Sequence, residues 1–116
     1  MQKRLLITGG EGGIAMACRE EFQSHGWEVL APSRHELDVS DSESVDAFIN
    51  GCGPIDLLLC AAGVTDDCLL GRMSEASWDN VIDVNLKGAF RCARAVSRQM
   101  LRRRAGHVIF VSSHSA

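Results

Sequence analysis

Residues 8–15 read Thr8-Gly9-Gly10-Glu11-Gly12-Gly13-Ile14-Ala15 and carry four of the 11 glycines in this 116-residue chain. The stretch follows a short apolar run, residues 5–7, and precedes a segment with helical spacing of apolar residues. A strand, a glycine-rich turn and a helix start together form an anion-binding device, because unpaired N–H groups and the positive end of the helix dipole face the turn. Glycine also lets the backbone approach a pyrophosphate with no Cβ in the way. A purely structural turn is the alternative interpretation.

Apolar patterning outside this stretch predicts alternating strands and helices. We expect strands at residues 5–8, 27–31, 55–60 and 107–111, and helices at 12–25, from Asp41 onward, and over 77–103. The run 55–60 is almost wholly apolar, which is typical of a strand covered on both faces. Strands that alternate with helices predict an α/β fold with a parallel sheet and right-handed crossovers. No helix follows the last strand, so the architecture is expected to be incomplete at its C-terminal side.

Composition excludes several classes of function. The net charge of −3 argues against a nucleic-acid-binding role, and no apolar run approaches the length of a membrane span. The five cysteines are odd in number and lack Cys-x-x-Cys spacing, so we expect neither a zinc site nor a disulfide framework. The four histidines are scattered, and no metal is expected. Reduced cysteines and the lack of a signal peptide favour a cytoplasmic protein.

Several segments, taken in order, resemble the motifs of the short-chain dehydrogenase/reductase family, and of its 3-oxoacyl-[acyl-carrier-protein] reductase-like members in particular. The glycine stretch has the spacing Thr-Gly-x-x-x-Gly-x-Gly, with Ala15 in place of the last glycine. The other matching segments are Asp38-Val39, Cys60-Ala61-Ala62-Gly63, Val84-Asn85-Leu86-Lys87-Gly88 and the stretch 106–113. The resemblance covers essentially the whole chain. It implies a Rossmann-like, doubly wound parallel sheet with helices on both faces, formed by residues 1–116 as the N-terminal, dinucleotide-binding portion of such an enzyme.

The resemblance also implies which residues contact a dinucleotide. They are Thr8, Gly9, Gly10, Glu11, Gly13, Ile14, Asp38, Val39, Ala61, Ala62 and Gly63, together with Ser33 and Arg34 after the second strand. Cys60 and Ala61 replace two family asparagines whose side chains stabilise the central sheet. Only residues 32–37 separate the second strand from Asp38, which is too short for the usual helix and strand, so the third family strand is expected to be vestigial or missing.

Arg34 bears on the choice of cofactor. An acid at the end of the second strand would bind a ribose 2′-hydroxyl, whereas an arginine there favours a 2′-phosphate. This chain has Ser33-Arg34 and no acid until Glu36. Because a guanidinium binds phosphate through a planar fork, NADP(H) is expected in preference to NAD(H). The alternative is that Arg34 is a solvated loop charge.

Two residues resemble catalytic residues of the family. Asn85 falls within an apolar helical stripe, where an unpaired amide would cost on the order of 1–3 kcal/mol, so we expect it to be buried with partners. It matches the asparagine that holds a water in a proton relay; a structural role is the alternative. Ser113, with Ser112 as its neighbouring candidate, matches the serine that hydrogen-bonds a substrate carbonyl.

The family reaction is hydride transfer between a nicotinamide and a carbonyl or alcohol substrate, with a tyrosine as acid/base and a lysine four residues later. This chain has no tyrosine, and its lysines, Lys3 and Lys87, lie elsewhere. The chain as given is therefore not expected to be a competent reductase. A non-catalytic dinucleotide-binding or sensing module and an inactive truncated fragment are the alternatives.

Four arginines, at positions 91, 94, 98 and 102, align on one face of the predicted 77–103 helix. A solvated face with cations near the helix C-terminus is the favoured interpretation, and a nucleic-acid stripe is the alternative. The resemblance further implies that this helix packs against a second copy in a homo-oligomer.

Overall fold

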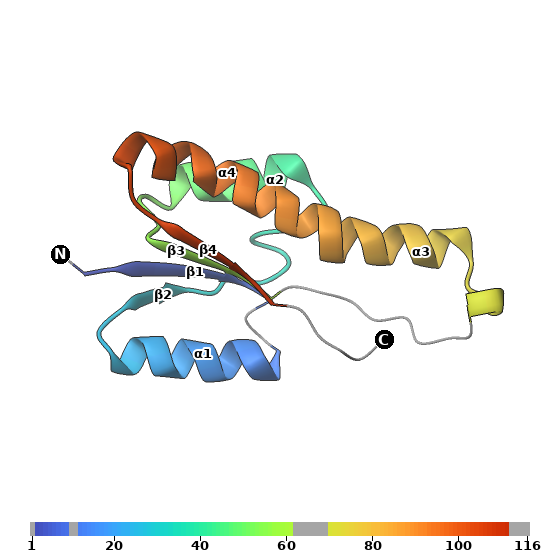
Figure 1. Ribbon diagram of the computed structural model, residues 1–116, viewed down its shortest axis with the longest axis horizontal. Coiled ribbons are helices and arrows are strands. Elements are labelled where there is room, and N and C mark those ends of the chain that lie inside the picture. Colours follow the sequence, from blue (N-terminus) through green and yellow to red (C-terminus); the bar gives the residue numbers. More distant parts are fainter. Residues whose placement is uncertain (1, 10–11, 62–69, 112–116) are drawn as a thin grey trace.

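The computed structural model describes residues 2–9, 12–61 and 70–111. Its centre is a four-stranded parallel sheet in the order β2-β1-β3-β4 (Figure 1). The strands are β1 (Arg4–Thr8), β2 (Glu28–Leu30), β3 (Leu57–Cys60) and β4 (His107–Phe110). The helices are α1 (Gly13–Ser24), α2 (Ser42–Gly51), α3 (Glu75–Ile82) and α4 (Gly88–Arg103). The predicted alternation of strands and helices is confirmed within a few residues at each boundary.

The helices lie on both faces of the sheet. Figure 1 shows α1 on one side of the sheet and α2 and α4 on the other. The strand β1 lies between β2 and β3. After β1 the chain adds β2 on one side of it, and it later adds β3 and then β4 on the other side. The sheet is therefore doubly wound, as predicted, and β1 and β3 flank the point where the strand order reverses.

Each face of the sheet has its own core. On the α2 and α4 side, Leu6, Leu58 and Cys60 pack with buried residues of both helices, including Val45 and Val96. On the α1 side the buried cluster is smaller and comprises Leu5, Ile7, Ala15, Leu57 and Leu59. All four residues of β3 are buried, which confirms that this strand is covered on both faces.

Local sequence explains most helix ends. The Asp41 carboxylate accepts a hydrogen bond from the Glu43 N–H and caps α2, and the Ser74 hydroxyl accepts from the Ser77 N–H and caps α3. After α1, Gly26 adopts φ 84°, the left-handed conformation that glycine takes without a Cβ penalty. The helix α4 ends at Arg103, as predicted, and Arg104 adopts the left-handed conformation at φ 54°.

The predicted long helix is present, but it is not uniform. α3 continues through a π-helical turn, Asp83–Lys87, into α4. Neither α3 nor this turn contains a buried residue, because both extend past the sheet that α4 covers (Figure 1). The apolar stripe predicted from spacing therefore holds in α4, at Val96 and Met100, but not at Trp78, which is 54% exposed.

The connection from β2 to α2 contains no strand. Residues 31–41 form turns and irregular structure, so the third strand of the family pattern is missing here, as the short spacing predicted. Within the part of the chain that the structure describes, no helix has the length and apolar character that crossing a bilayer requires.

Candidate functional site

The carboxyl ends of β1, β3 and β4 lie side by side. Thr8 pairs with Cys60, and the Ala61 N–H donates to the Thr8 carbonyl at 3.2 Å. On the other side of β3, the Val111 N–H donates to the Cys60 carbonyl at 3.1 Å. Open parallel sheets bind ligands in the crevice outside this edge, where the strand order reverses. The fold thus brings Thr8, Gly9 and Ala61 to the edge at which a ligand is expected.

The connection between β1 and α1 is described at its two ends, Gly9 and Gly12. Gly9 adopts φ 70°, and its carbonyl accepts a hydrogen bond from the Gly12 N–H at 3.2 Å. Gly12 is the N-cap of α1 and, lacking a side chain, makes no capping hydrogen bond; the first turn of α1 contains no acid. The N-terminal N–H groups of this 12-residue helix therefore have no side-chain acceptor from the cap, and the dipole there favours an anion.

Gly13, the first residue of α1, is not required by the fold. A Cβ built on it meets no atom of the described chain within 4 Å, and its φ is not positive. Next to it, Ile14 is 64% exposed, whereas Ala15 is buried against β1 and β3. The Ile14 side chain is therefore outside the α1-side core, whereas Cys18 and Phe22 of the same helix pack against it. Ala15 packs behind the turn, as expected for the residue that replaces the third glycine.

The loop after β2 places Ser33, Arg34 and Asp38 on one irregular segment. The Ser33 carbonyl accepts from the N–H groups of Glu36 and Leu37, and Glu36 Oε1 accepts from the Ser33 N–H at 3.1 Å. Arg34 and Asp38 are exposed, whereas Val39 is buried. Hydrogen bonds from the Ser40 hydroxyl (2.6 Å) and the Ser40 N–H (3.0 Å) lower the pKa of the Asp38 carboxyl, with smaller contributions from nearby arginines. Asp38 is thus an oriented, ionised group.

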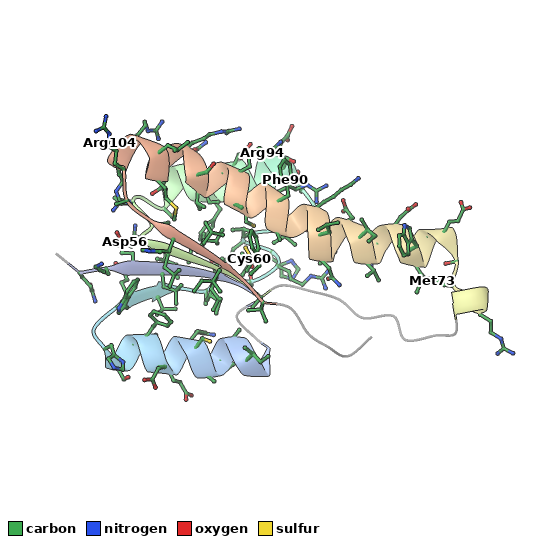
Figure 2. All side chains as sticks on the ribbon, in the orientation of Figure 1. Asp56, Cys60, Met73, Phe90, Arg94 and Arg104 are labelled. Atoms are coloured by element: carbon green, nitrogen blue, oxygen red, sulfur yellow. The ribbon has the colours of Figure 1, made fainter. Side chains whose placement is uncertain are left out.

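Cys60, at the end of β3, is not suited to nucleophilic chemistry. Burial, together with the neighbouring Cys92, raises the pKa of the Cys60 thiol to about 12 (Figure 2). Burial raises the pKa of Cys92 to about 11. Because the thiolate is the reactive form, both residues behave as small apolar side chains of the core.

Asn85 does not lie where spacing predicted. It is exposed, in the π-helical turn beyond the covered part of the helix, so the expectation of a buried amide is wrong. Single π-helical turns inside α-helices are frequent at functional sites. The remaining predicted site residues, Gly10, Glu11, Ala62, Gly63 and Ser113 with its neighbour Ser112, lie outside the described residues.

A charged pair that the sequence pattern did not indicate joins α4 to the π-helical turn before it. Arg91 Nη2 donates to Asp83 Oδ1 at 2.7 Å, and only 15% of the Arg91 side chain is exposed. The interpretation of Arg91 as part of a solvated arginine face is therefore wrong. The two residues are eight apart, and no simple helical spacing would have singled them out.

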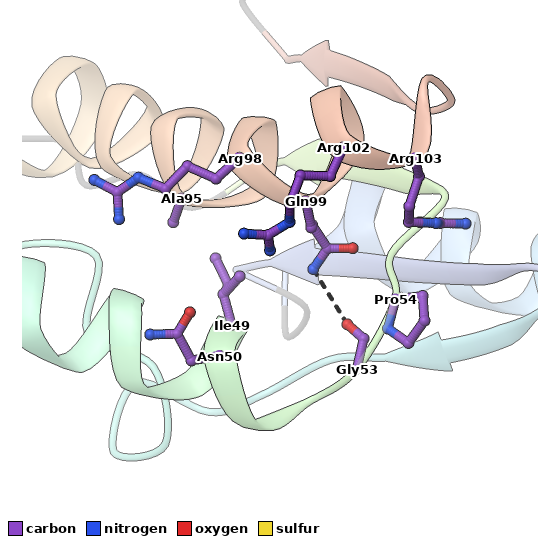
Figure 3. A pocket seen from close by; sticks show the side chains of 9 residues that line it. All are labelled: Ile49, Asn50, Gly53, Pro54, Ala95, Arg98, Gln99, Arg102 and Arg103. Carbon is purple, nitrogen blue, oxygen red and sulfur yellow. Dashed lines mark hydrogen bonds between the residues drawn. The ribbon is translucent and has the colours of Figure 1, made fainter.

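A separate hollow of about 300 Å³ lies between the C-terminal ends of α2 and α4 (Figure 3). Its lining includes Arg98, Arg102 and Gln99, and the Gln99 amide donates to the Gly53 carbonyl at 3.2 Å and accepts from the Ile55 N–H at 2.7 Å. It borders the residues that lead into β3, at the amino edge of the sheet. It is therefore not part of the candidate site at the carboxyl edge.

A doubly wound parallel sheet with a glycine-rich turn at its reversal point defines a Rossmann-like protein. A model of the short chain dehydrogenase family matches residues 3–116, and the chain belongs to that family.

Known relatives and solved structures agree with this assignment. The chain is 35% identical to the 3-oxoacyl-[acyl-carrier-protein] reductase MabA of Mycobacterium tuberculosis, over 99% of this chain and 52% of the relative. It is 34% identical to the 3-oxoacyl-[acyl-carrier-protein] reductase FabG of Staphylococcus aureus, over 97% of this chain and 56% of the relative. Among solved structures, ElxO with NADP bound superposes with a TM-score of 0.89 at 27% identity, covering 97% of this chain and 56% of ElxO. The chain thus spans about half the length of the relatives it matches.

Proposed function

We propose that this chain is the cofactor-holding part of an NADP(H)-dependent oxidoreductase that acts on a carbonyl or alcohol substrate. The observation that carries the proposal is Gly13. The fold does not require glycine there, because its φ is ordinary and the space around its Cβ is open. Gly51 shares both properties, so the argument for a ligand rests on where Gly13 lies. Gly13 stands at the start of α1, where a pyrophosphate would meet the helix dipole.

Different residues would contact different parts of the dinucleotide. Gly9, with its positive φ, shapes the turn, and the N–H groups at the start of α1 would receive the pyrophosphate. Ala61, whose N–H donates to the Thr8 carbonyl, lies next to β1 at the same edge of the sheet and would contact the cofactor there. Asp38, ionised and oriented by Ser40, would accept from the adenine amino group. Gly10, Glu11, Ile14, Val39, Ala62 and Gly63 complete the proposed cofactor contacts.

The preference for NADP(H) rests on Arg34. Its guanidinium is exposed on the loop after β2, and the nearest acid in that turn, Glu36, is hydrogen-bonded to the Ser33 N–H. A planar guanidinium fork would pair with a 2′-phosphate, whereas the 2′-hydroxyl of NAD(H) offers it no charge. ElxO, a structural neighbour, was solved with NADP bound, which supports the same choice.

The bound nicotinamide would supply the hydride. In this proposal Asn85, exposed in the π-helical turn, orients water near the substrate, and Ser113 donates to the substrate carbonyl oxygen. The chain contains no tyrosine that could act as the proton donor. We therefore assign binding and orientation, and not turnover, to the residues of this chain.

Titration of nicotinamide fluorescence with NADPH and NADH tests the proposal. We expect NADPH to bind the chain more tightly than NADH, and Arg34→Ala to remove the difference. Equal affinity of the wild type for both cofactors would contradict the role of Arg34. If neither cofactor bound, the proposed function itself would fail.

A second proposed function is a cytoplasmic module that binds or senses the dinucleotide without turning it over, for which the binding groups of these 116 residues would suffice. The coding sequence downstream of Ala116 separates the two. An in-frame Tyr-x-x-x-Lys segment supports the enzyme, and an immediate stop supports the module.

Self-association through the long helix is a further part of the proposal. Phe90 is 57% exposed on α4, and the Arg94 guanidinium lies over its ring at 4.9 Å (Figure 2). Leu101 is also exposed on this helix. Sedimentation equilibrium tests this part. We expect a dimer that Phe90→Lys dissociates; a monomeric wild type would rule it out.

A further inference from the structure

Arg91, on α4, joins two segments that lie far apart in the sequence. Its Nη1 donates to the Val39 carbonyl at 3.0 Å and to the Asp83 carbonyl at 3.1 Å, and its Nη2 donates to Asp83 Oδ1 at 2.7 Å. Val39 belongs to the loop after β2, and Asp83 begins the π-helical turn that contains Asn85. One guanidinium thus holds the backbone of both segments.

The loop that carries Val39 has few other ties to the rest of the fold. It contributes no strand, so no ladder of backbone hydrogen bonds anchors it to the sheet. Most of its hydrogen bonds are local. The N–H groups of Glu36 and Leu37 donate to the Ser33 carbonyl, and the Ser40 N–H donates to the Asp38 carboxylate. The Asp38 N–H donates to the Ser44 hydroxyl at 2.9 Å. Burial of Leu37 and Val39 provides packing but no fixed direction for the backbone. The Arg91 contact supplies that direction.

Gly88, three residues before Arg91 and on the same helix face, brings the loop close enough for this contact. A Cβ on Gly88 would lie 2.9 Å from Val39 Cγ2 and 3.4 Å from the Val39 carbonyl oxygen. Glycine at position 88 therefore allows Val39 to pack directly against the helix backbone. The close approach at Gly88 and the hydrogen bonds of Arg91 are two independent observations of the same contact.

The chemistry of the contact requires arginine. Three acceptors, two carbonyl oxygens and one carboxylate oxygen, surround a side chain that is largely buried. A guanidinium presents several N–H donors in a fixed plane, whereas a lysine ammonium is a single point charge on a flexible stem. Its charge is matched by Asp83, so no uncompensated charge is buried.

We propose that Arg91 is a positioning residue that locks the adenosine-side loop, through Val39, to the helical turn that carries Asn85. Asp38 is held beside Val39, so the lock fixes where an adenosine would lie relative to Asn85. The nucleotide-binding consequence rests on the proposed function, whereas the lock itself is a property of the fold. The π-helical turn and the loop are thereby expected to move together.

Two measurements on purified protein test the lock, each with a matched control. Arg91→Met keeps an apolar stem but removes all three hydrogen bonds. Arg98→Met makes the same change on the same helix at an exposed arginine whose closest described carboxylate, Asp46, is 3.9 Å away. The first measurement is amide hydrogen exchange at Asp38, Ser40 and Asp41. We expect Arg91→Met to speed exchange there by about tenfold or more, the size of a lost charge-assisted hydrogen bond, and Arg98→Met to leave it unchanged.

The second measurement is the affinity for NADPH and for adenosine 2′,5′-bisphosphate, well below the melting temperature. Arg91→Met should weaken both by about tenfold, because the adenosine-side loop loses its place, whereas Arg98→Met should stay within about twofold of wild type. Arg91→Lys, which retains charge and stem, gives a second variant if Arg91→Met does not fold. It should show the same increase in exchange, reduced in size, since an ammonium cannot reach all three acceptors.

The outcomes separate the two proposals. Equal exchange in the Arg91 and Arg98 variants would overturn the lock. Faster exchange with unchanged adenosine affinity would restrict Arg91 to a structural role and overturn the positioning proposal. Failure of the wild type to bind either nucleotide would overturn the proposed function, and with it the positioning role, while the exchange comparison would still decide whether the lock exists.

Discussion

The two faces of the sheet differ in how completely they are covered. On one face, α2 and α4 bury Leu6, Leu58 and Val96 in a continuous cluster. On the other, α1 contacts β1 and β2, and Ile109 of the edge strand β4 is 47% exposed. The difference shows that strand order and helix placement, and not the apolar character of a strand, decide which side chains stabilise the fold. Among the described residues, 5–8 of β1 and 57–60 of β3 are buried on both faces of the sheet, whereas Ile109 and Phe110 of β4, which point to opposite faces, are both exposed.

The largest expected effect comes from the covered face. Leu58 is completely buried, so Leu58→Ala should lower the free energy of unfolding by about 2–5 kcal/mol through lost burial and the cavity it leaves. Ile109→Ala, on the open face, should cost less than about 1 kcal/mol. Urea denaturation of both variants measures the difference. Equal losses would show that the Ile109 side chain is packed as well as that of Leu58, and the comparison would not stand.

A smaller loss is expected where helix and loop touch on the covered face. Gly88→Ala introduces a Cβ 2.9 Å from Val39 Cγ2, and the overpacking should cost about 1–3 kcal/mol despite the better helix propensity of alanine. Gly51→Ala, near the end of α2, is the matched control, because a Cβ there meets nothing within 4 Å. It should be neutral or slightly stabilising in thermal denaturation. A Gly88 variant as stable as the Gly51 variant would show that Val39 yields freely.

Low pH should reduce the stability that Asp56 provides at the amino edge of the sheet. Partial burial opposes ionisation of Asp56, but hydrogen bonds from the Arg103 side chain (2.8 Å) and the Arg4 N–H (2.8 Å) prevail and lower the pKa of Asp56 below its ordinary 3.8. A lowered folded-state pKa gives stability that is present above the unfolded value and is lost as the pH falls through the folded value. Wild type should therefore exceed Asp56→Asn by about 1 kcal/mol at neutral pH, with the gap closing below pH 3.8. A gap independent of pH between 7 and about 2 would contradict this assignment.

The smallest effect is expected at the end of α4. Arg104 holds a left-handed conformation that glycine adopts without steric cost, so Arg104→Gly should raise stability by up to about 1 kcal/mol. Arg102→Gly, inside the helix, should lower stability by about 1 kcal/mol. Thermal unfolding of the two variants should thus shift in opposite directions. A shift in the same direction would mean that the cap conformation differs from the one described.

Features set by neighbouring residues could be predicted from the sequence. Asp41 and Ser74 cap helices because their side chains reach backbone N–H groups two or three residues away, and Gly26 ends α1 because its φ is available within one residue. The apolar run 55–60 predicted a strand covered on both faces, and all four residues of β3 are buried. The loss of the third strand followed from chain length alone.

Features set by distant segments could not be predicted. Trp78 and Asn85 fit the spacing of an apolar stripe, but both side chains are exposed. The stripe is buried only where the helix lies over the sheet, and helical periodicity does not tell how far along the helix the sheet extends. By helical spacing Arg91 belongs to a solvated arginine face, but in the structure it donates to the Val39 carbonyl and to the Asp83 carboxylate. In the candidate site, the glycine turn was therefore predictable, whereas the contact that joins the adenosine-side loop to the helix was not.

The most direct test of the account is an NADPH titration of Gly13→Val, with Gly51→Ala as the control. The space around Gly13 admits a Cβ, so the variant should unfold within a few degrees of wild type by circular dichroism. Because the added side chain would occupy the place of the pyrophosphate, we predict that NADPH binding is lost in Gly13→Val and retained in Gly51→Ala. A folded Gly13→Val protein that binds NADPH as tightly as wild type would contradict the claim that this glycine turn holds the dinucleotide.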